Sequence, residues 1–568
     1  MKARFTARVQ FLSACIIIFA LILVGKLYFV QIVSGEEYSA KADRQYSKPS
    51  TSLFSRGSIF FTHKDGQLFT AATLKACFVI AVNPNTLENP LDVWEKISPF
   101  LSIEKEYFLE RALKAGDPYE EIAKKVETKE AEAIQALGIK GIIVQKDNCR
   151  FYPAEKMASN TVGIVAFKED EYAGRYGLER YYEDVLVRDT TDSYQNFFAE
   201  IFTNIKETLF KEKPLEGNIV TSIEFGTQMF LEKKLEEITD TWSSEFSGGI
   251  VMDPKTGEVV AMAVNPTFNP NALEASEVLS FGNPLVESVY EMGSIIKPLT
   301  VASGIDAGVI TSKTTYKDEG FLVLNTARIS NYDGKGRGVV DMQTVLSKSL
   351  NTGVAFVVSK LGNKAFADYF KSLDMGEETG IDLPNETRGL IDNLDSTRDI
   401  EYATASYGQG IALTPIGTVR ALSTLANGGS LPSPHIAKEI HYSVGVSKEI
   451  STLPPKPVFK KETAEEVTRM LVSVVDTALL NGKIKNPRYS VAAKTGTAQI
   501  AKPEGGGYYT DRFLHSFFGY FPAYDPQFIV FLYTVYPKKV EYASETLTQS
   551  FADITQFLIH HYEIPPDR

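Results

Sequence analysis

The sequence predicts an α/β protein whose C-terminal domain is an antiparallel sheet flanked by helices and interrupted by a helical insert. A smaller α+β region and one N-terminal membrane-spanning helix precede this domain. Three observations support the prediction. The 568 residues suffice for roughly two or three domains. The longest apolar stretch lies at the N-terminus. Two hairpin patterns enclose a long helical region in the C-terminal half.

The first 35 residues are predicted to form a short cytoplasmic tail and a transmembrane helix. Basic residues at 2–8 precede an apolar stretch at 9–33, which is long enough to cross a bilayer at ~1.5 Å per residue. The basic flank should stay in the cytoplasm, so the remaining chain is expected outside it. A cleaved signal peptide is the alternative, but the stretch is longer than a usual signal core and no Ala-x-Ala site follows.

The region between this helix and the C-terminal domain is predicted to hold a linker at 36–55, a mixed domain at 56–220 and a connecting helix at 221–247. Thr221 and Ser222 are expected to cap that helix. No catalytic constellation is evident in the mixed domain. Its expected strands are Phe78–Val82 and Gly141–Val144, and its expected helices are Glu104–Ala115 and Pro118–Leu137.

The C-terminal domain is predicted to span 248–562. Its first hairpin joins Gly249–Met252 to Glu258–Val264, and its second joins Leu514–Phe521 to Phe528–Val535. Residues 285–480 between the hairpins have mainly helical patterns. A final helix carries one apolar stripe, formed by Phe551, Ile554, Phe557 and Leu558.

The composition excludes several kinds of function. Apolar residues at 44% and charged residues at 23% are typical of a globular protein. The net charge of −12 and the lack of basic runs make nucleic-acid binding unexpected, because phosphate contacts need Lys and Arg. The three cysteines and six histidines form no metal-binding pattern, so no metal site is expected. Whether Cys77 pairs with Cys149 is left open.

Ser294 and Lys297 form a Ser-x-x-Lys pattern, which offers a nucleophile with its own base. If a helix begins at Ser294, Lys297 lies one turn later on the same face. The lysine must be neutral to accept the hydroxyl proton, so its pKa must fall through burial or a nearby cation. The same pattern at Ser102 lies in a charged stretch, and we interpret it as a helix surface.

Ser349 and Asn351 follow a predicted helix at Asp341–Lys348. A second hydroxyl can relay a proton, and an Asn side chain can hold both a lysine and a substrate amide. Taken alone, a Ser-x-Asn pattern at this place is also typical of a simple cap or turn.

A third pattern, Lys494-Thr495-Gly496-Thr497, lies in a β-like run from Val491 to Ile500. A strand edge can align a substrate backbone, Gly496 permits close approach, and Lys and Thr groups can bind a carboxylate. The N–H groups of Thr497 and Ser294 could form an oxyanion hole. A similar Lys255-Thr256-Gly257 is interpreted as a hairpin turn.

The order Ser-x-x-Lys, Ser-x-Asn, Lys-Thr-Gly matches the motif set of serine-type penicillin-recognising enzymes. With further landmarks, the chain resembles a class B penicillin-binding protein over nearly its whole length. Residues 56–220 would be the elongated non-catalytic pedestal (dimerisation-type) domain and 248–562 the transpeptidase domain, with its penicillin-binding/serine β-lactamase-like fold. The landmarks are Arg56-Gly57, Arg150-Phe151-Tyr152-Pro153, Gly177-Leu178-Glu179 and Gly408-Gln409-Gly410.

The sequence departs from the family pattern at two places. Met292 replaces the common proline before Gly293-Ser294, and Thr62-His63-Lys64-Asp65-Gly66 replaces a more usual Asp-Arg-Asn-Gly. Asn351 rather than Asp, and Thr495 rather than Ser, favour the septal over the elongation type.

The resemblance implies a peptidoglycan D,D-transpeptidase of the bacterial plasma membrane that needs no metal or organic cofactor. Lys297 would take the proton of Ser294, which attacks the penultimate D-Ala carbonyl of a stem peptide. Ser349, steered by Asn351 and Lys494, would pass a proton to the leaving D-Ala. The terminal carboxylate would be bound by Lys494, Thr495 and Thr497. The implied partners are peptidoglycan stem peptides, β-lactams, a membrane glycosyltransferase of the SEDS type and other division proteins.

Three alternatives use the same fold. A β-lactamase or β-lactam sensor shares the motifs, but no Glu is placed by a family-like pattern to activate a hydrolytic water. A D,D-carboxypeptidase would use water as the acceptor and stays open. An inactive scaffold is disfavoured because all three motifs are intact.

Overall fold

The computed structural model describes residues 54–114, 116–168, 171–188, 216–273, 280–443, 445–503 and 505–568. The predicted transmembrane helix and nearly all of the linker at 36–55 lie outside these residues. Among the helices that are described, none combines the length and apolar character that a bilayer span needs.

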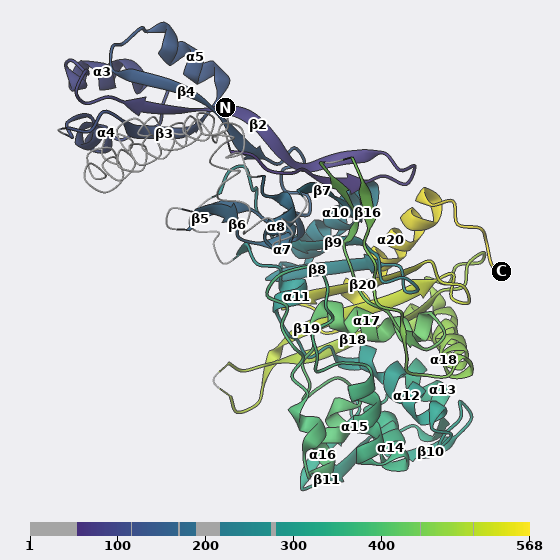
Figure 1. Cartoon of the computed structure of the whole chain (residues 1–568). Helices are drawn as coiled ribbons and strands as arrows, with labels where there is room; N and C mark the ends of the chain where they lie inside the picture. Colours follow the sequence, from purple (N-terminus) through teal and green to yellow (C-terminus); the bar gives the residue numbers. More distant parts are fainter. Residues whose placement is uncertain are drawn as a thin grey trace, which may run out of the picture. The chain divides into compact units, whose positions relative to one another are not determined.

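A five-stranded antiparallel sheet is the frame of the C-terminal domain (Figure 1). Both predicted hairpins form, and pairing of β20 with β8 joins them into one sheet. The first and last strands of the domain therefore lie side by side, and β18 is left at one edge. The strand order is β18 (Ala492–Ala501), β19 (Tyr508–Phe521), β20 (Phe528–Val535), β8 (Phe246–Met252) and β9 (Val259–Asn265).

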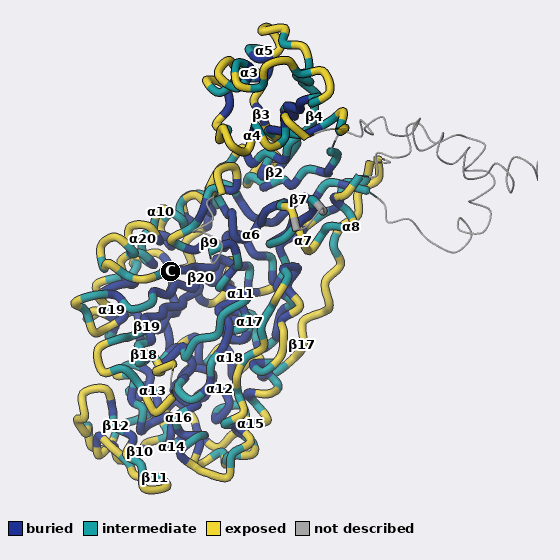
Figure 2. The backbone as a smooth tube through the Cα atoms, turned by 90° about the vertical axis from the view of Figure 1, so that its left-hand side faces the viewer, coloured by how far each residue is buried: buried dark blue, intermediate teal, exposed yellow. Residues whose placement is uncertain are grey.

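Side chains of these strands alternate between two apolar layers, as the pleat of a strand requires. On β8, Val251 belongs to the layer that contains α10 (Phe225–Trp242) and α20 (Thr548–His561), whereas Ile250 belongs to the layer of the insert helices. Figure 2 shows the sheet strands as mainly buried, in dark blue. The sheet is thus covered on both faces.

The final helix confirms its predicted stripe. Phe551, Ile554 and Leu558 are buried against the sheet, and Phe557 stacks on Phe230 of α10 at 4.2 Å between ring centroids. Helices α10 and α20 therefore cover the same face of the sheet together.

The predicted helical insert is confirmed in outline. Besides the short pair β14 (Ser430–Leu431) and β17 (Lys456–Pro457), it contains two further small antiparallel strand pairs. Its main helices are α12 (Lys297–Asp306), α13 (Met342–Ser347), α14 (Asn351–Leu361), α15 (Asn363–Ser372), α16 (Asp399–Ala405), α17 (Pro415–Ala426) and α18 (Lys461–Ser473). The two further pairs are β10 (Thr315–Asp318) with β13 (Gly338–Asp341) and β11 (Phe321–Leu324) with β12 (Ala327–Ser330).

The N-terminal domain is built on a second sheet, which also takes two strands from the C-terminal domain. The borrowed strands are β15 (Ala437–Tyr442) and β16 (Ser447–Glu449), and β15 pairs with β7. The other strands are β1 (Ile59–Thr62), β2 (Leu68–Val82), β3 (Glu120–Val126), β4 (Ile142–Phe151) and β7 (Gly217–Glu224). The helices are α3 (Pro90–Ile97), α4 (Lys105–Ala112), α5 (Thr128–Ala136), α6 (Ser159–Val162), α7 (Gly177–Tyr181) and α8 (Glu183–Leu186).

Two local predictions are wrong. The stretch 118–137 is not one helix, because its first half forms β3 on β2 and only the second half is α5. Thr221 and Ser222 do not cap a helix, because they lie within β7 between β1 and β15, and the N-cap of α10 is Glu224. In both places strand pairing outweighs local propensity.

Cys77 and Cys149 form a disulfide, which the sequence left open. They lie on the adjacent antiparallel strands β2 and β4, and their Cα atoms are 5.8 Å apart. The bond joins two strands of the N-terminal sheet that already pair along their length.

Three landmark residues of the N-terminal domain, far apart in the sequence, converge on one buried ion cluster. Glu179 accepts from the Nε atoms of both Arg56 and Arg150, each at 2.6 Å, and none of the three side chains is more than 1% exposed. Glu183 also contacts Arg56 at 2.7 Å, from a partly exposed position. The Glu179 carboxylate therefore bridges two buried guanidinium groups, and Glu183 supplies the second negative charge.

Replacing Glu179 with Ala should lower the free energy of unfolding by about 3–5 kcal/mol, because it leaves buried Arg150 without its carboxylate and Arg56 with Glu183 alone. Replacing Glu127, which pairs with Lys75 at the surface, should cost only about 0–1 kcal/mol. Urea unfolding followed by circular dichroism measures both. An equal, small effect of the two substitutions would contradict this account of the cluster.

Candidate active site

Ser294 lies at the beginning of a helical segment, as predicted, but the first turn is a 3₁₀ turn. Residues Gly293–Ile296 form this turn, and α12 begins at Lys297. Because a 3₁₀ helix has three residues per turn, Ser294 and Lys297 still share one face. Pro298 falls in the first turn of α12, where its missing N–H costs little.

The turn that carries Ser294 packs directly on strand β18. A Cβ atom on Gly293 would lie 2.9 Å from the carbonyl oxygen of Thr497, and one on Gly496 would lie 2.7 Å from the carbonyl oxygen of Met292. Ser516 of β19 also donates to that Met292 oxygen, at 2.7 Å. Only glycine at both positions permits this approach, which brings the predicted nucleophile to the sheet edge.

The hydroxyl of Ser349 lies between two lysines. Nζ of Lys297 is 3.1 Å from Ser349 Oγ and donates to the Ser349 carbonyl oxygen at 2.6 Å. Nζ of Lys494 is 3.0 Å from the same Oγ and donates to the Thr495 carbonyl oxygen at 3.0 Å. All three predicted motifs therefore meet at one point.

Ser349 itself has a left-handed backbone. Its φ of 54° is unusual for a residue with a Cβ atom, and it lies in the short connection between α13 and α14. Such a conformation costs of order 1 kcal/mol or more and is typical of functional positions. It turns the Ser349 carbonyl and hydroxyl toward the same lysine.

Burial changes the acidity of both lysines. Burial lowers the pKa of Lys297 well below its usual value, and the nearby charge of Lys494 lowers it further. Burial also lowers the pKa of Lys494, to about 7. Lys297 is fully buried and Lys494 is 3% exposed. Lys297 therefore meets one requirement of the motif, a lowered pKa, and the hydroxyl that it contacts is that of Ser349.

Behind β18, His515 fixes the wall of the cleft. It pairs with Thr497 across β18 and β19, and its ring nitrogens lie 3.0 Å from Thr546 Oγ1 and 3.0 Å from the Glu541 carbonyl oxygen. Burial lowers the pKa of His515 to about 4, so the ring is neutral near pH 7. The segment after β20 is thereby held against β19, beside the strand that carries Thr497.

Asn351 faces the same cleft but does not hold a lysine as the sequence suggested. Its Nδ2 donates to the carbonyl oxygen of Ser330 at 2.9 Å. The side chain therefore ties the start of α14 to the end of β12. Asn351 therefore helps to form the wall of the cleft and does not orient the lysine base that the sequence suggested.

A cleft of about 800 Å³ joins the predicted residues. Six of them line it: Ser294, Ser349, Asn351, Lys494, Thr495 and Thr497. Lys297 contacts it through Ser349, and Gly496 lies against Met292 beneath it. Gln409, from the landmark Gly408-Gln409-Gly410, also lines it. Further lining residues carry no motif that sequence reasoning could recognise: Arg328, Tyr332, Glu541 and Tyr542. Tyr332 and Tyr542 meet edge to face with centroids 5.9 Å apart.

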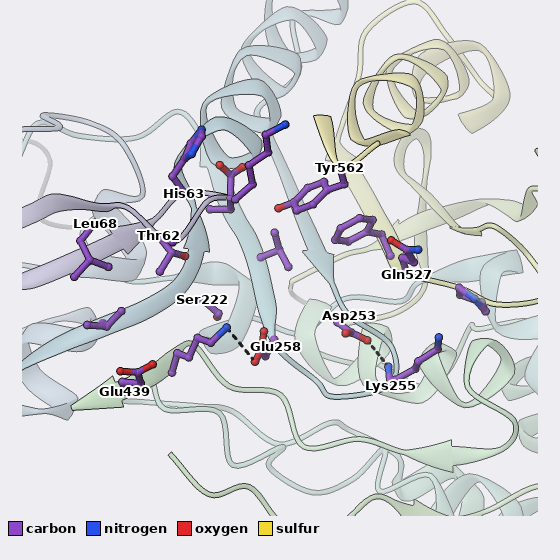
Figure 3. Close-up of a pocket in the computed structure, with 18 of the residues that line it drawn as sticks. Thr62, His63, Leu68, Ser222, Asp253, Lys255, Glu258, Glu439, Gln527 and Tyr562 are labelled. Carbon is purple, nitrogen blue, oxygen red and sulfur yellow. Dashed lines mark hydrogen bonds and ion pairs between the residues drawn. The ribbon is translucent and has the colours of Figure 1, made fainter. Parts of the chain in front are cut away.

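A second hollow, of about 790 Å³, is lined in part by Lys255 of the other Lys-Thr-Gly sequence (Figure 3). Lys255 lies there beside Asp253, whose carboxylate accepts from the Lys255 N–H at 2.7 Å. Ser222 in this hollow donates to backbone carbonyl oxygens of Val259 and Ile436. The interpretation of Lys255-Thr256-Gly257 as a hairpin turn is confirmed. Ser102 is exposed just before α4, at the surface of the N-terminal domain.

Known proteins share this architecture. Residues 248–556 match the penicillin binding protein transpeptidase domain, and residues 55–222 match the penicillin-binding protein dimerisation domain. Stage V sporulation protein D of Bacillus subtilis is 28% identical over 92% of this chain and 80% of its own length. Peptidoglycan D,D-transpeptidase FtsI of Escherichia coli K12 is 24% identical over 99% of this chain and 92% of its own length. The solved structure of penicillin binding protein 3 from Mycobacterium tuberculosis, complexed with aztreonam, has a TM-score of 0.68 and 20% identity. The match covers 91% of this chain and 98% of the solved chain.

Acylation of Ser294 by a β-lactam should become faster as the pH rises through the pKa of Lys297, because only the neutral amine accepts the hydroxyl proton. Since that pKa is lowered well below 10.5, the rise should be complete well before pH 10. Rapid-mixing measurements of the acylation rate constant between about pH 5 and 10 test this. Lys494→Gln should move the midpoint to higher pH, and Lys494→Arg should not. A wild-type midpoint near 10.5 would refute the assignment of Lys297 as the base.

Proposed function

The chain belongs to the penicillin-binding protein transpeptidase family, and we propose that it is a membrane-anchored peptidoglycan D,D-transpeptidase of septal type whose nucleophile is Ser294. One observation carries the assignment of residues: the hydroxyl of Ser349 lies within 3.1 Å of Lys297 Nζ and 3.0 Å of Lys494 Nζ, in the cleft that also contains Ser294. The FtsI relative is named a peptidoglycan D,D-transpeptidase.

In the first half of the reaction, neutral Lys297 accepts the proton of Ser294, and Ser294 Oγ attacks the carbonyl carbon of the penultimate D-Ala. The N–H groups of Ser294 and Thr497 stabilise the oxyanion. The peptide bond to the terminal D-Ala then breaks. Its nitrogen takes a proton by way of Ser349, and the D-Ala leaves as the free amino acid.

Donor binding uses the strand edge. Lys494, Thr495 and Thr497 bind the terminal carboxylate, and β18 pairs with the donor backbone. Thr497 is fixed for this role, because its Oγ1 accepts from the Ala543 N–H at 3.1 Å. In the second half-reaction, an amine of a neighbouring stem peptide attacks the Ser294 ester. The amine loses a proton, Ser294 regains one, and a cross-link remains.

The proposed location outside the cytoplasm has two supports. The apolar stretch at 9–33 follows a basic flank. The disulfide between Cys77 and Cys149 suits an oxidising compartment. The septal assignment is supported by Asn351 and Thr495 and by the similarity to FtsI. In this setting a separate membrane glycosyltransferase of the SEDS type would supply the glycan strands.

Fluorescent penicillin should label the wild-type protein, and Ser294→Ala should abolish the labelling because it removes the acyl acceptor. Ser102→Ala is the matched control and should label normally. Gel fluorescence measures both. An unlabelled but folded wild type would favour the inactive scaffold, and unchanged labelling of Ser294→Ala would exclude this nucleophile. With a donor stem peptide and an acceptor amine, a cross-linked product separates a transpeptidase from a carboxypeptidase.

The full chain should remain in the membrane pellet after an alkaline carbonate wash, because a transmembrane helix is held by burial of its apolar surface. A variant that lacks residues 9–33 should move to the soluble fraction. Immunoblotting of the two fractions measures this. Release of the full chain by carbonate would contradict the proposed anchor.

A further inference from the structure

Glu291, three residues before Ser294, joins separate parts of the cleft wall through one carboxylate. Its Oε1 accepts from the backbone N–H of Gly410 at 2.8 Å and from the hydroxyl of Tyr508 at 2.9 Å. Gly410 follows Gln409, which lines the cleft. Tyr508 is the first residue of β19, the strand that pairs with β18.

The carboxylate is poorly solvated for a charged group. Its Oε2 is buried and has no hydrogen-bond partner among the described residues. Burial raises the pKa of Glu291. It also raises the pKa of Tyr407 and Tyr508, and the charge of Glu291 adds to both shifts. A buried carboxylate with one unsatisfied oxygen costs folding free energy, so a role in stability alone does not explain it.

The segment before Ser294 and the segment after α16 run side by side through three successive contacts. Tyr290 and Leu413 exchange two backbone hydrogen bonds of 2.9 Å, and the Gly293 N–H donates to the Gly408 carbonyl oxygen at 3.0 Å. The contact of Glu291 with Gly410 lies between them. It is the one side-chain contact of the three, and the one that also reaches β19.

Gly408 and Gly293 leave little room for adjustment. A Cβ atom on Gly408 would lie 2.3 Å from the Gly293 carbonyl oxygen. A shift of the 408–410 segment is therefore transmitted directly to the turn that carries Ser294. Reacting groups that are displaced by about 1 Å can lose about 100-fold in rate.

We propose that Glu291 is a positioning residue for acyl transfer, which fixes the Gln409 segment and the beginning of β19 to the turn that carries Ser294. This inference rests on the proposed function. Glu291 does not touch the reacting atoms in this account. It acts by holding the wall that bears Gln409 at a set distance from the nucleophile and from β18.

The test is the rate of acylation by fluorescent penicillin in four variants of the full chain. Glu291→Ala should lower the limiting first-order rate constant by about 10- to 100-fold, with the same final stoichiometry of labelling. Glu291→Gln should stay within about three-fold of wild type, because its carbonyl oxygen can accept both hydrogen bonds. Tyr508→Phe should be intermediate.

Glu287→Ala is the matched control. Glu287 lies four residues earlier, at the end of α11 (Pro284–Glu287), is half-buried, and accepts from the Asn283 N–H rather than from a cleft segment. Its loss should leave the rate constant unchanged. Thermal unfolding of each variant gives the fraction of the protein that is folded and can therefore be labelled.

A merely structural role predicts fewer labelled molecules at an unchanged rate constant, and that result for Glu291→Ala would overturn the inference. If Glu291→Ala does not fold, the acylation rate constant of Tyr508→Phe takes its place. A value equal to that of the wild type would also overturn the inference. Equal losses in Glu291→Gln and Glu291→Ala would also do so. Absence of labelling in the wild type would instead refute the proposed function.

Discussion

One hydroxyl held between two buried amines is the interaction on which the cleft depends. Ser349 Oγ contacts Lys297 and Lys494 at once, and each lysine belongs to a different layer of the domain. Two ammonium groups so close, out of water, destabilise each other's charge. The pair is therefore biased toward one neutral lysine, and in the proposed mechanism that lysine is Lys297.

The sheet topology makes this contact possible. Because hairpins β8–β9 and β19–β20 join through β20 and β8, strand β18 is left at an edge, open to the helical insert. Glycines at 293, 408 and 496 then allow three backbones to approach within distances that any side chain would prevent. The insert contributes Lys297 at the start of α12 and Ser349 just before α14. The chemistry thus depends on close backbone contact at one strand edge.

The sequence was sufficient for the features that are local. Apolar runs joined by turn sequences predicted both hairpins, a helical stripe predicted α20, and three short motifs predicted the residues that meet in the cleft. Features that depend on strand pairing between distant segments could not be predicted. The stretch 118–137 has a helical pattern, but its first half pairs with β2 as a strand. Nothing in the pattern of 437–449 indicated that β15 and β16 would join the sheet of the other domain.

Residues that act through a distant partner were likewise hidden. Arg56, Arg150 and Glu179 appeared only as separate landmarks, although together they form one ion cluster. Glu291 stood in the Glu-x-Gly-Ser pattern before Ser294, but its contacts could not be predicted, because its partners Gly410 and Tyr508 lie 119 and 217 positions away. Such contacts follow from the assembled fold.

The most direct test of the central claim is a crystal structure of the full external region after reaction with a β-lactam. The account predicts an ester between Ser294 Oγ and the opened lactam carbonyl carbon, with the carbonyl oxygen accepting from the N–H groups of Ser294 and Thr497. Lys297 and Lys494 should both remain beside Ser349. An acyl group on another residue, or amines of Lys297 and Lys494 separated on opposite sides of the domain, would contradict it.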